Sequence, residues 1–268
     1  MEQARTFWEN QSEKYSTAFE KLPELAAYLD RAERKHLFKV INVSPEMHVL
    51  DLGCGTGRWA FEFARKCKRV TAVDFAEGMV WRAQSTAEEL GLNNIDFQVA
   101  SVSDFKTDDK FDIILISGVL VYFDDETLGT IISSVKKLLK PGGKIISRET
   151  VAIHQRQEIR NEIHEKIGAE YSAIYRLPDE YKQMFADYGL KTLYAEDFTP
   201  TNFPMILFRK FVPDRQKNNK MVRRLLKTAL IVQYGLDPVL LKNKWLYRPI
   251  MNRFWKIKSM LFIYGIDS

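Results

Sequence analysis

Cysteine is scarce in this sequence, and long apolar runs are missing. Its 268 residues include two cysteines, Cys54 and Cys67, whose spacing fits neither a metal site nor a disulfide framework. We therefore expect a reducing, cytoplasmic location. The first residues lack a cationic stretch followed by an apolar one, so we expect no secretory signal. No apolar run approaches the roughly 20 residues that a membrane-spanning helix needs.

Positive charge is unevenly distributed along the chain. The formal net charge is +5, yet the segment from Arg209 onward carries 14 Lys and Arg against three Asp, a local balance of +11. The preceding residues are therefore acidic overall, at −6. Neither an internal repeat nor a low-complexity stretch accompanies this asymmetry. A hydrophobic content of 46% and a charged content of 28% are typical of a soluble globular protein.

One stretch combines a buried strand, a glycine turn and a helix. Val49–Leu52 is the apolar end of a predicted parallel strand, and Gly53, Gly55 and Gly57 follow it at alternate positions. Glycine lets the backbone turn sharply and approach a ligand closely. A helix is predicted from Arg58 to Lys66, and its free N–H groups would face a ligand carboxylate or phosphate.

An acidic residue follows the next predicted strand, Arg69–Val73. Asp74 at this position can accept hydrogen bonds from ribose hydroxyls, as in dinucleotide-binding folds. The glycine spacing differs from the dinucleotide pattern, because Asp51 precedes glycines at every second position. Glycines alone could also form a simple tight turn between strand and helix.

With Asp51, the three glycines and Asp74 together, residues 35–212 resemble the class I S-adenosylmethionine-dependent methyltransferases. The resemblance implies S-adenosylmethionine (SAM) as cofactor and a doubly wound, seven-stranded Rossmann-like α/β sheet. It also implies that the glycines wrap the methionine moiety, that Asp51 orients its ammonium group and that Asp74 holds the ribose.

The rest of the chain can be divided on the same basis. We expect an N-terminal helical lid at residues 1–40, a SAM-binding domain at 41–212 with an insertion at 151–177 over the substrate, and a basic, aromatic helical extension at 213–268. Further helices are predicted at Glu77–Gly91, Glu126–Leu139, Gln155–Lys166 and Asp179–Tyr188, and further strands at Ile95–Ala100, Phe111–Ile116, Lys144–Ser147, Lys191–Asp197 and Phe203–Phe211.

Several cofactor contacts are less firmly indicated. Where the family usually has an Asp for the adenine amino group, this chain has Ser101 and Val102, so the adenine partner departs from the pattern. Met79 would lie along the other face of the adenine, or in the core. Arg58 either pairs with the cofactor carboxylate or lies on the surface. Tyr15 of the lid is an aromatic candidate for a cofactor contact, or it packs on the sheet.

The reacting end is predicted at the strand that ends in Ser117. Ser117 should border the methyl group, and Tyr122 should lie near the reacting centre. A base is needed only if the acceptor must lose a proton, and His154, Glu149 and Tyr122 are the candidates. The side chains expected to orient the substrate are Arg148, Tyr175 and Arg176. We expect transfer to an oxygen, less readily a nitrogen, of a small-molecule, glycan or lipid-linked acceptor.

Neighbouring activities lack their motifs in this sequence. The segment after the fourth strand has no Asp/Asn-Pro-Pro motif for amide nitrogens, and no Pro-Cys pair exists for attack on cytosine. We predict no metal site. The basic extension could pack as a helical pair on the domain, lie on an anionic membrane or bind RNA. An RNA methyltransferase and a non-catalytic SAM-binding partner subunit therefore remain as alternatives.

Overall fold

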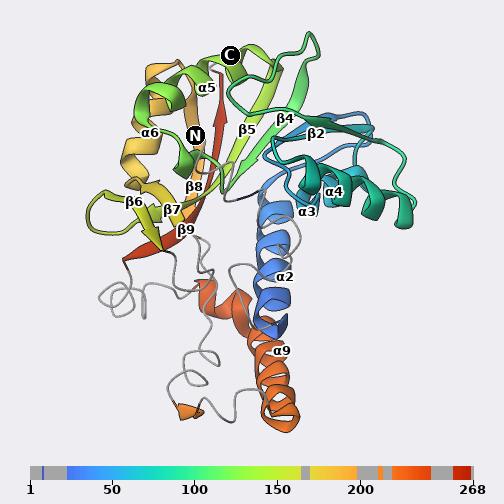
Figure 1. Ribbon diagram of the computed structural model, residues 1–268, viewed down its shortest axis with the longest axis vertical. Helices are drawn as coiled ribbons and strands as arrows, with labels where there is room; N and C mark the ends of the chain where they lie inside the picture. The colour runs from blue at the N-terminus through green and yellow to red at the C-terminus, as the bar shows by residue number, and fades with distance from the viewer. Residues whose placement is uncertain are drawn as a thin grey trace. The chain divides into compact units, whose positions relative to one another are not determined.

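The computed structural model describes Trp8, residues 23–163, 170–197, 211–213, 219–242 and 256–266. The chain forms two compact units (Figure 1). The first comprises residues 1–15, 43–197 and 256–268, and the second comprises residues 16–42 and 198–255.

A seven-stranded sheet organises the first unit, in the order β3-β2-β1-β4-β5-β9-β8. Only β9 runs antiparallel to its neighbours, and the other pairs are parallel. The strands are β1 (His48–Leu52), β2 (Arg69–Asp74), β3 (Ile95–Val99), β4 (Phe111–Ser117), β5 (Leu139–Ala152), β8 (Lys191–Asp197) and β9 (Ile257–Gly265). This order confirms the predicted doubly wound α/β fold.

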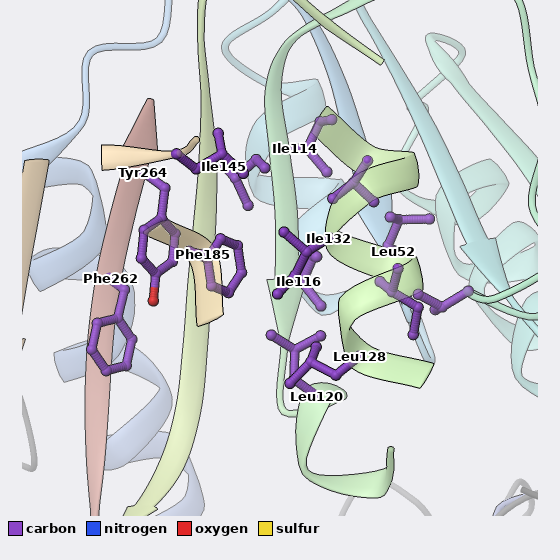
Figure 2. Close-up of a cluster of buried hydrophobic side chains, with 14 of the residues drawn as sticks. Leu52, Ile114, Ile116, Leu120, Leu128, Ile132, Ile145, Phe185, Phe262 and Tyr264 are labelled. Atoms are coloured by element: carbon purple, nitrogen blue, oxygen red, sulfur yellow. The ribbon is translucent and has the colours of Figure 1, made fainter. Parts of the chain in front are cut away.

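Helices cover the sheet on both faces, as parallel strands require. The helices α3 (Arg58–Ala64) and α4 (Glu77–Glu89) pack on β1, β2 and β3. The helices α5 (Asp125–Lys137) and α6 (Pro178–Asp187) contribute to the main core with side chains of β1, β4, β5 and β9. In Figure 2, aliphatic side chains such as Ile116 and Ile132 lie beside the rings of Phe185 and Tyr264. The latter two rings stack with their centroids 3.7 Å apart.

The final strand of the sheet differs from the prediction. The expected strand Phe203–Phe211 lies outside the described residues except for Phe211, and the strand between β5 and β8 is β9. Assigning residues 257–265 to a helical extension was therefore wrong. These residues are apolar enough to bury Met260 to Tyr264 within the sheet. Residues 198–256 thus separate two neighbouring strands of the sheet instead of following it.

The insertion after β5 is a hairpin. The strands β6 (Gln157–Ile163) and β7 (Glu170–Tyr175) pair antiparallel, so the helix expected at Gln155–Lys166 was wrong over residues 157–163. In β7, Tyr171, Ala173 and Tyr175 alternate with more exposed residues, which buries one face of the hairpin. Pairing with this half-apolar strand explains why polar β6 is extended.

In the second unit, α2 (Pro23–Val40) packs against α9 (Lys220–Lys242). Tyr28 of α2 is buried with Leu226 and Leu230 of α9. At one end of this contact, the Arg223 guanidinium lies 2.8 Å from the Glu24 carboxylate. Among the helices that the structure describes, none is both long and apolar enough to cross a bilayer.

Candidate functional site

The glycine turn, residues 53–57, follows β1 directly. Gly53, Gly55 and Gly57 all have positive φ, at 76°, 54° and 84°. The backbone amides of Gly53 and Cys54 both donate to the Val73 carbonyl of β2, at 2.8 and 3.0 Å. A Cβ atom on Gly53 would lie 2.3 Å from Cγ2 of Val119. Glycine is therefore required at position 53 by its backbone conformation and by the close approach of the loop after β4.

Asp74 fastens the glycine turn to the end of β2. One carboxylate oxygen accepts from the Gly55 amide at 2.8 Å, and the other accepts from the Ala76 amide at 3.0 Å. Burial raises the pKa of Asp74, and these backbone hydrogen bonds oppose that rise. Asp74 thus lies at the carboxyl end of its strand beside the turn, where the ribose contact was predicted. The contact itself stays a prediction.

Asp51 is a buried carboxylate one residue before the end of β1, with 1% of its surface exposed. Burial raises its pKa to about 7, and the negative charge of Asp74 adds to this, whereas Arg58 opposes it. Its Oδ2 atom is buried without a hydrogen-bond partner among the described residues. A buried acceptor of this kind suits a cationic amine, which would lower the pKa of Asp51 again. These residues therefore fit the ammonium group of SAM.

The start of α3 is tied to the end of β4 through an indole. Trp59 Nε1 donates to Ser117 Oγ at 3.2 Å, and the Arg58 guanidinium lies over the Trp59 ring, 4.6 Å from its centroid. Trp59 thus contacts two of the predicted site residues, Arg58 and Ser117. Trp59 itself was not predicted, although an aromatic residue in the first turn of the helix after the glycines could have indicated it.

Glu149 supports the β4 loop, which we define as residues 118–125. Its Oε1 accepts from the backbone amides of Val119 and Leu120, at 3.4 and 3.3 Å. The side chain is fully buried, and burial raises its pKa to about 8. At neutral pH the group is mostly protonated. The geometry therefore assigns Glu149 to holding the loop, in place of the predicted role as base.

Arg176 holds the same loop from its other end. Its guanidinium donates to the carbonyls of Leu120 and Phe123, at 3.3 and 2.7 Å, and to the Asp125 carboxylate at 2.8 Å. The side chain is fully buried. The prediction that Arg176 orients the substrate was therefore wrong, because it is committed to the backbone of the β4 loop.

An aromatic cluster forms where the β4 loop meets the hairpin, comprising Trp8, Tyr122, Tyr171 and Tyr175. Tyr122 lies in the 3₁₀ turn η2 (Leu120–Tyr122), and its ring meets those of Trp8 and Tyr171 edge-on, with centroids 6.0 and 6.1 Å apart. The hydroxyls of Tyr171 and Tyr175 are 3.0 Å apart, and burial raises the pKa of both. Tyr122 and Tyr175 are thus brought together, through Tyr171, which was not among the predicted site residues.

Arg148 lies beside the end of β4. It pairs with Ser117 in the sheet, and its carbonyl accepts from the Gly118 amide at 2.7 Å. Its Nη1 would be 3.9 Å from a Cβ on Gly118, so the half-buried guanidinium lies over that glycine. His154, by contrast, is exposed in the turn between β5 and β6. Its role as base stays a prediction.

The remaining predicted residues lie mostly in packed positions. Val102 belongs to the main core, and Met79 is 2% exposed within α4, so both are core residues in this structure. The half-buried Ser101 has its hydroxyl 2.9 Å from that of Ser103. Tyr15 lies outside the described residues. Across the described part of the chain, no three His, Cys, Asp or Glu side chains are grouped to hold a metal.

Comparison with known proteins agrees with this arrangement. Residues 49–143 match a family described as "Methyltransferase domain". Phosphoethanolamine N-methyltransferase 1 of Triticum aestivum is 28% identical over 186 residues, which cover 68% of this chain and 36% of that protein. Nodulation protein S of Sinorhizobium fredii is 28% identical over 107 residues, 40% of this chain and 49% of that protein. The chain thus spans about two-fifths of the length of the plant relatives, 35–43%.

Solved structures share the fold. A DhpI complex with S-adenosylhomocysteine has a TM-score of 0.59 at 20% identity and covers 74% of this chain and 91% of its own. Phosphoethanolamine N-methyltransferase 1 of Haemonchus contortus has a TM-score of 0.59 at 17% identity, covering 98% of this chain and 48% of its own. The matched segment contains the glycine turn, which lies at the carboxyl end of β1, a central strand of the sheet. Residues 49–143 of this chain are thus similar to a methyltransferase domain, and the fold is the one that S-adenosylmethionine-dependent methyltransferases have.

Proposed function

We propose that the protein transfers the methyl group of SAM to the nitrogen of a small amine. SAM supplies a methyl group on a sulfonium, which is already activated for displacement. The protein has to align the acceptor and exclude water. An unprotonated amine is nucleophilic without a strong base, whereas an alcohol is not. The nitrogen acceptor replaces the oxygen that the sequence favoured.

The observation that carries this proposal is that Glu149 is engaged in hydrogen bonds to the β4 loop. Its carboxyl group is fully buried and accepts hydrogen bonds from the backbone of the β4 loop, so it is not placed to take a proton from an alcohol. Relatives support the same choice. The plant proteins that this chain matches at 23–28% identity are phosphoethanolamine N-methyltransferases, whose acceptor atom is a nitrogen.

The aromatic cluster and Arg148 suggest how such an acceptor is held. Tyr122 carries its ring from the β4 loop into the cluster, and aromatic faces attract ammonium groups. Arg148, half-buried over Gly118, would pair with an acidic group on the acceptor. On the cofactor side, Asp51 would hold the ammonium group and Asp74 the ribose. His154 is left without an assigned step.

A matched pair of acceptors tests the proposal. The protein is incubated with methyl-labelled SAM and either phosphoethanolamine or 2-hydroxyethyl phosphate, which differ only in the amine and the hydroxyl. We expect label in the amine and none in the alcohol, detected by mass spectrometry. Label in the alcohol alone, or only in added tRNA, would overturn the nitrogen assignment.

A pair of variants at Tyr122 then tests the acceptor site. Tyr122→Phe keeps the ring and should retain most of the transfer to the amine, whereas Tyr122→Leu should raise the KM about tenfold through loss of the ring. An equal KM in wild type and both variants would exclude the cluster as the amine site. Unchanged SAM affinity in both variants is the control for folding.

A further inference from the structure

The helix α9 has a second apolar face that α2 does not cover. Leu226 and Leu230 are buried with Tyr28 of α2. An exposed stripe, which we define as Met221, Leu225, Val232 and Leu236, runs along another side of the helix, with exposed fractions of 72, 62, 58 and 52%. At 100° per residue these four positions fall within an arc of about 60°. The helix thus has two apolar faces, one buried against α2 and one exposed.

Positive charge lies to one side of the exposed stripe. Lys220, Arg224 and Lys227 are exposed on α9, and the sequence from 220 to 236 contains no acidic residue. Arg223 is committed to Glu24 and is not counted with them.

We propose that α9 lies on an anionic lipid surface, with the exposed stripe in the headgroup boundary and the flanking cations against lipid phosphates. Apolar residues beside a row of lysines and arginines are the pattern of interfacial helices. A 23-residue helix is about 35 Å long and can lie flat on a bilayer. This is distinct from crossing it, for which no described helix is suited.

The charge pattern favours a membrane over other occupants. A second copy of the chain would bring the same row of cations against the first, with no acidic residue of α9 between 220 and 236 to pair with them. RNA would use the cations but would leave four exposed aliphatic side chains without a role. Anionic lipid uses both features of the helix.

Vesicle flotation of the full chain tests the proposal. We expect binding to vesicles of phosphatidylcholine with about 30% phosphatidylserine, little binding to phosphatidylcholine alone, and weaker binding as salt rises. Leu225→Ser with Val232→Ser should lower the partition coefficient about tenfold or more. Arg224→Glu with Lys227→Glu should abolish the preference for phosphatidylserine.

Trp81→Ser is the matched control, because Trp81 is also a helical residue with a large apolar side chain that is 69% exposed, but it lies on α4. It should float as wild type does, and all variants should keep wild-type SAM affinity. The proposal fails if wild-type protein does not float with anionic vesicles or if the stripe variants float equally well. A dimer in solution that the stripe variants dissociate would assign the stripe to a second copy instead, and RNA binding that only the charge variants weaken would assign the helix to RNA.

Discussion

Substitution of Gly53 by alanine should damage both the fold and the cofactor site. Gly53 has a φ of 76°, and the new Cβ would lie 2.3 Å from Cγ2 of Val119. The left-handed conformation costs a non-glycine residue about 1–2 kcal/mol. Forcing Val119 aside adds about 1–3 kcal/mol of overpacking. The expected loss in free energy of unfolding is therefore about 2–5 kcal/mol.

Gly142→Ala separates the two contributions. Gly142 has nearly the same φ, 75°, yet nothing lies within 4 Å of its added Cβ. Its expected cost is the conformational part alone, about 1–2 kcal/mol. The effect of alanine on the unfolded chain is common to both variants and cancels in their difference. The difference between the two variants then measures the clash with Val119.

Urea unfolding and calorimetric titration with SAM are the assays. We expect Gly142→Ala to bind SAM as wild type does. Gly53→Ala should bind much more weakly, because a displaced Val119 disturbs both the glycine turn and the loop that Glu149 holds. Equal stability losses and equal SAM affinities in the two variants would refute this reasoning.

Three further variants test the buried charges. In wild type, the free energy of unfolding should fall as pH rises from about 4.5 to about 8, because folded Glu149 and Asp51 keep protons that the unfolded chain releases. Glu149→Gln should make this decline smaller in unfolding series at pH 5 to 9 and leave the part that Asp51 contributes. Arg176→Met should lower the free energy of unfolding by about 2–4 kcal/mol in urea, since it leaves the two buried loop carbonyls without their donor, while Asp125 keeps its pairing with Arg156. A loss below about 0.5 kcal/mol would contradict the role of Arg176 in holding the loop. Asp51→Asn should keep or raise stability in thermal unfolding while weakening SAM binding about tenfold or more, and unchanged SAM affinity would contradict its role.

The glycine turn and the central strands could be predicted because their signals are local. An apolar run, alternate glycines and an acidic residue at the next strand end are all read within Val49–Asp74. The structure adds hydrogen bonds between these same parts, such as that from the Gly55 amide to Asp74. Local sequence and tertiary contacts coincide in this region.

The last strand could not be predicted because its pairing is not local. Both Phe203–Phe211 and Ile257–Gly265 are apolar runs of strand length, and periodicity does not rank them. What distinguishes Ile257–Gly265 is its tertiary pairing, because β9 lies between β5 and β8 and hydrogen-bonds to both. The strand lies some sixty residues beyond β8 along the chain, where the basic composition directed attention to helices.

The buried charges show the same dependence on distant contacts. Arg176 was predicted at the substrate because it lies in the insertion at 151–177, yet its partners include backbone carbonyls more than fifty residues earlier. The predicted strand Lys144–Ser147 stopped short of Glu149, whereas β5 continues to Ala152 and contains it. Glu149 is buried there because the β4 loop folds over it and donates to its carboxyl group. Residue type and position along a strand indicate a charged site, and the packing decides what the charge does.

Calorimetric titration of wild type and Asp74→Ala with SAM tests the central claim most directly. The claim is that the glycine turn and the carboxylate at the end of β2 together hold the cofactor. We predict saturable binding of one SAM per chain in wild type and no detectable binding in Asp74→Ala, with circular dichroism showing that the variant is folded. Wild-type affinity in a folded Asp74→Ala variant would contradict the claim.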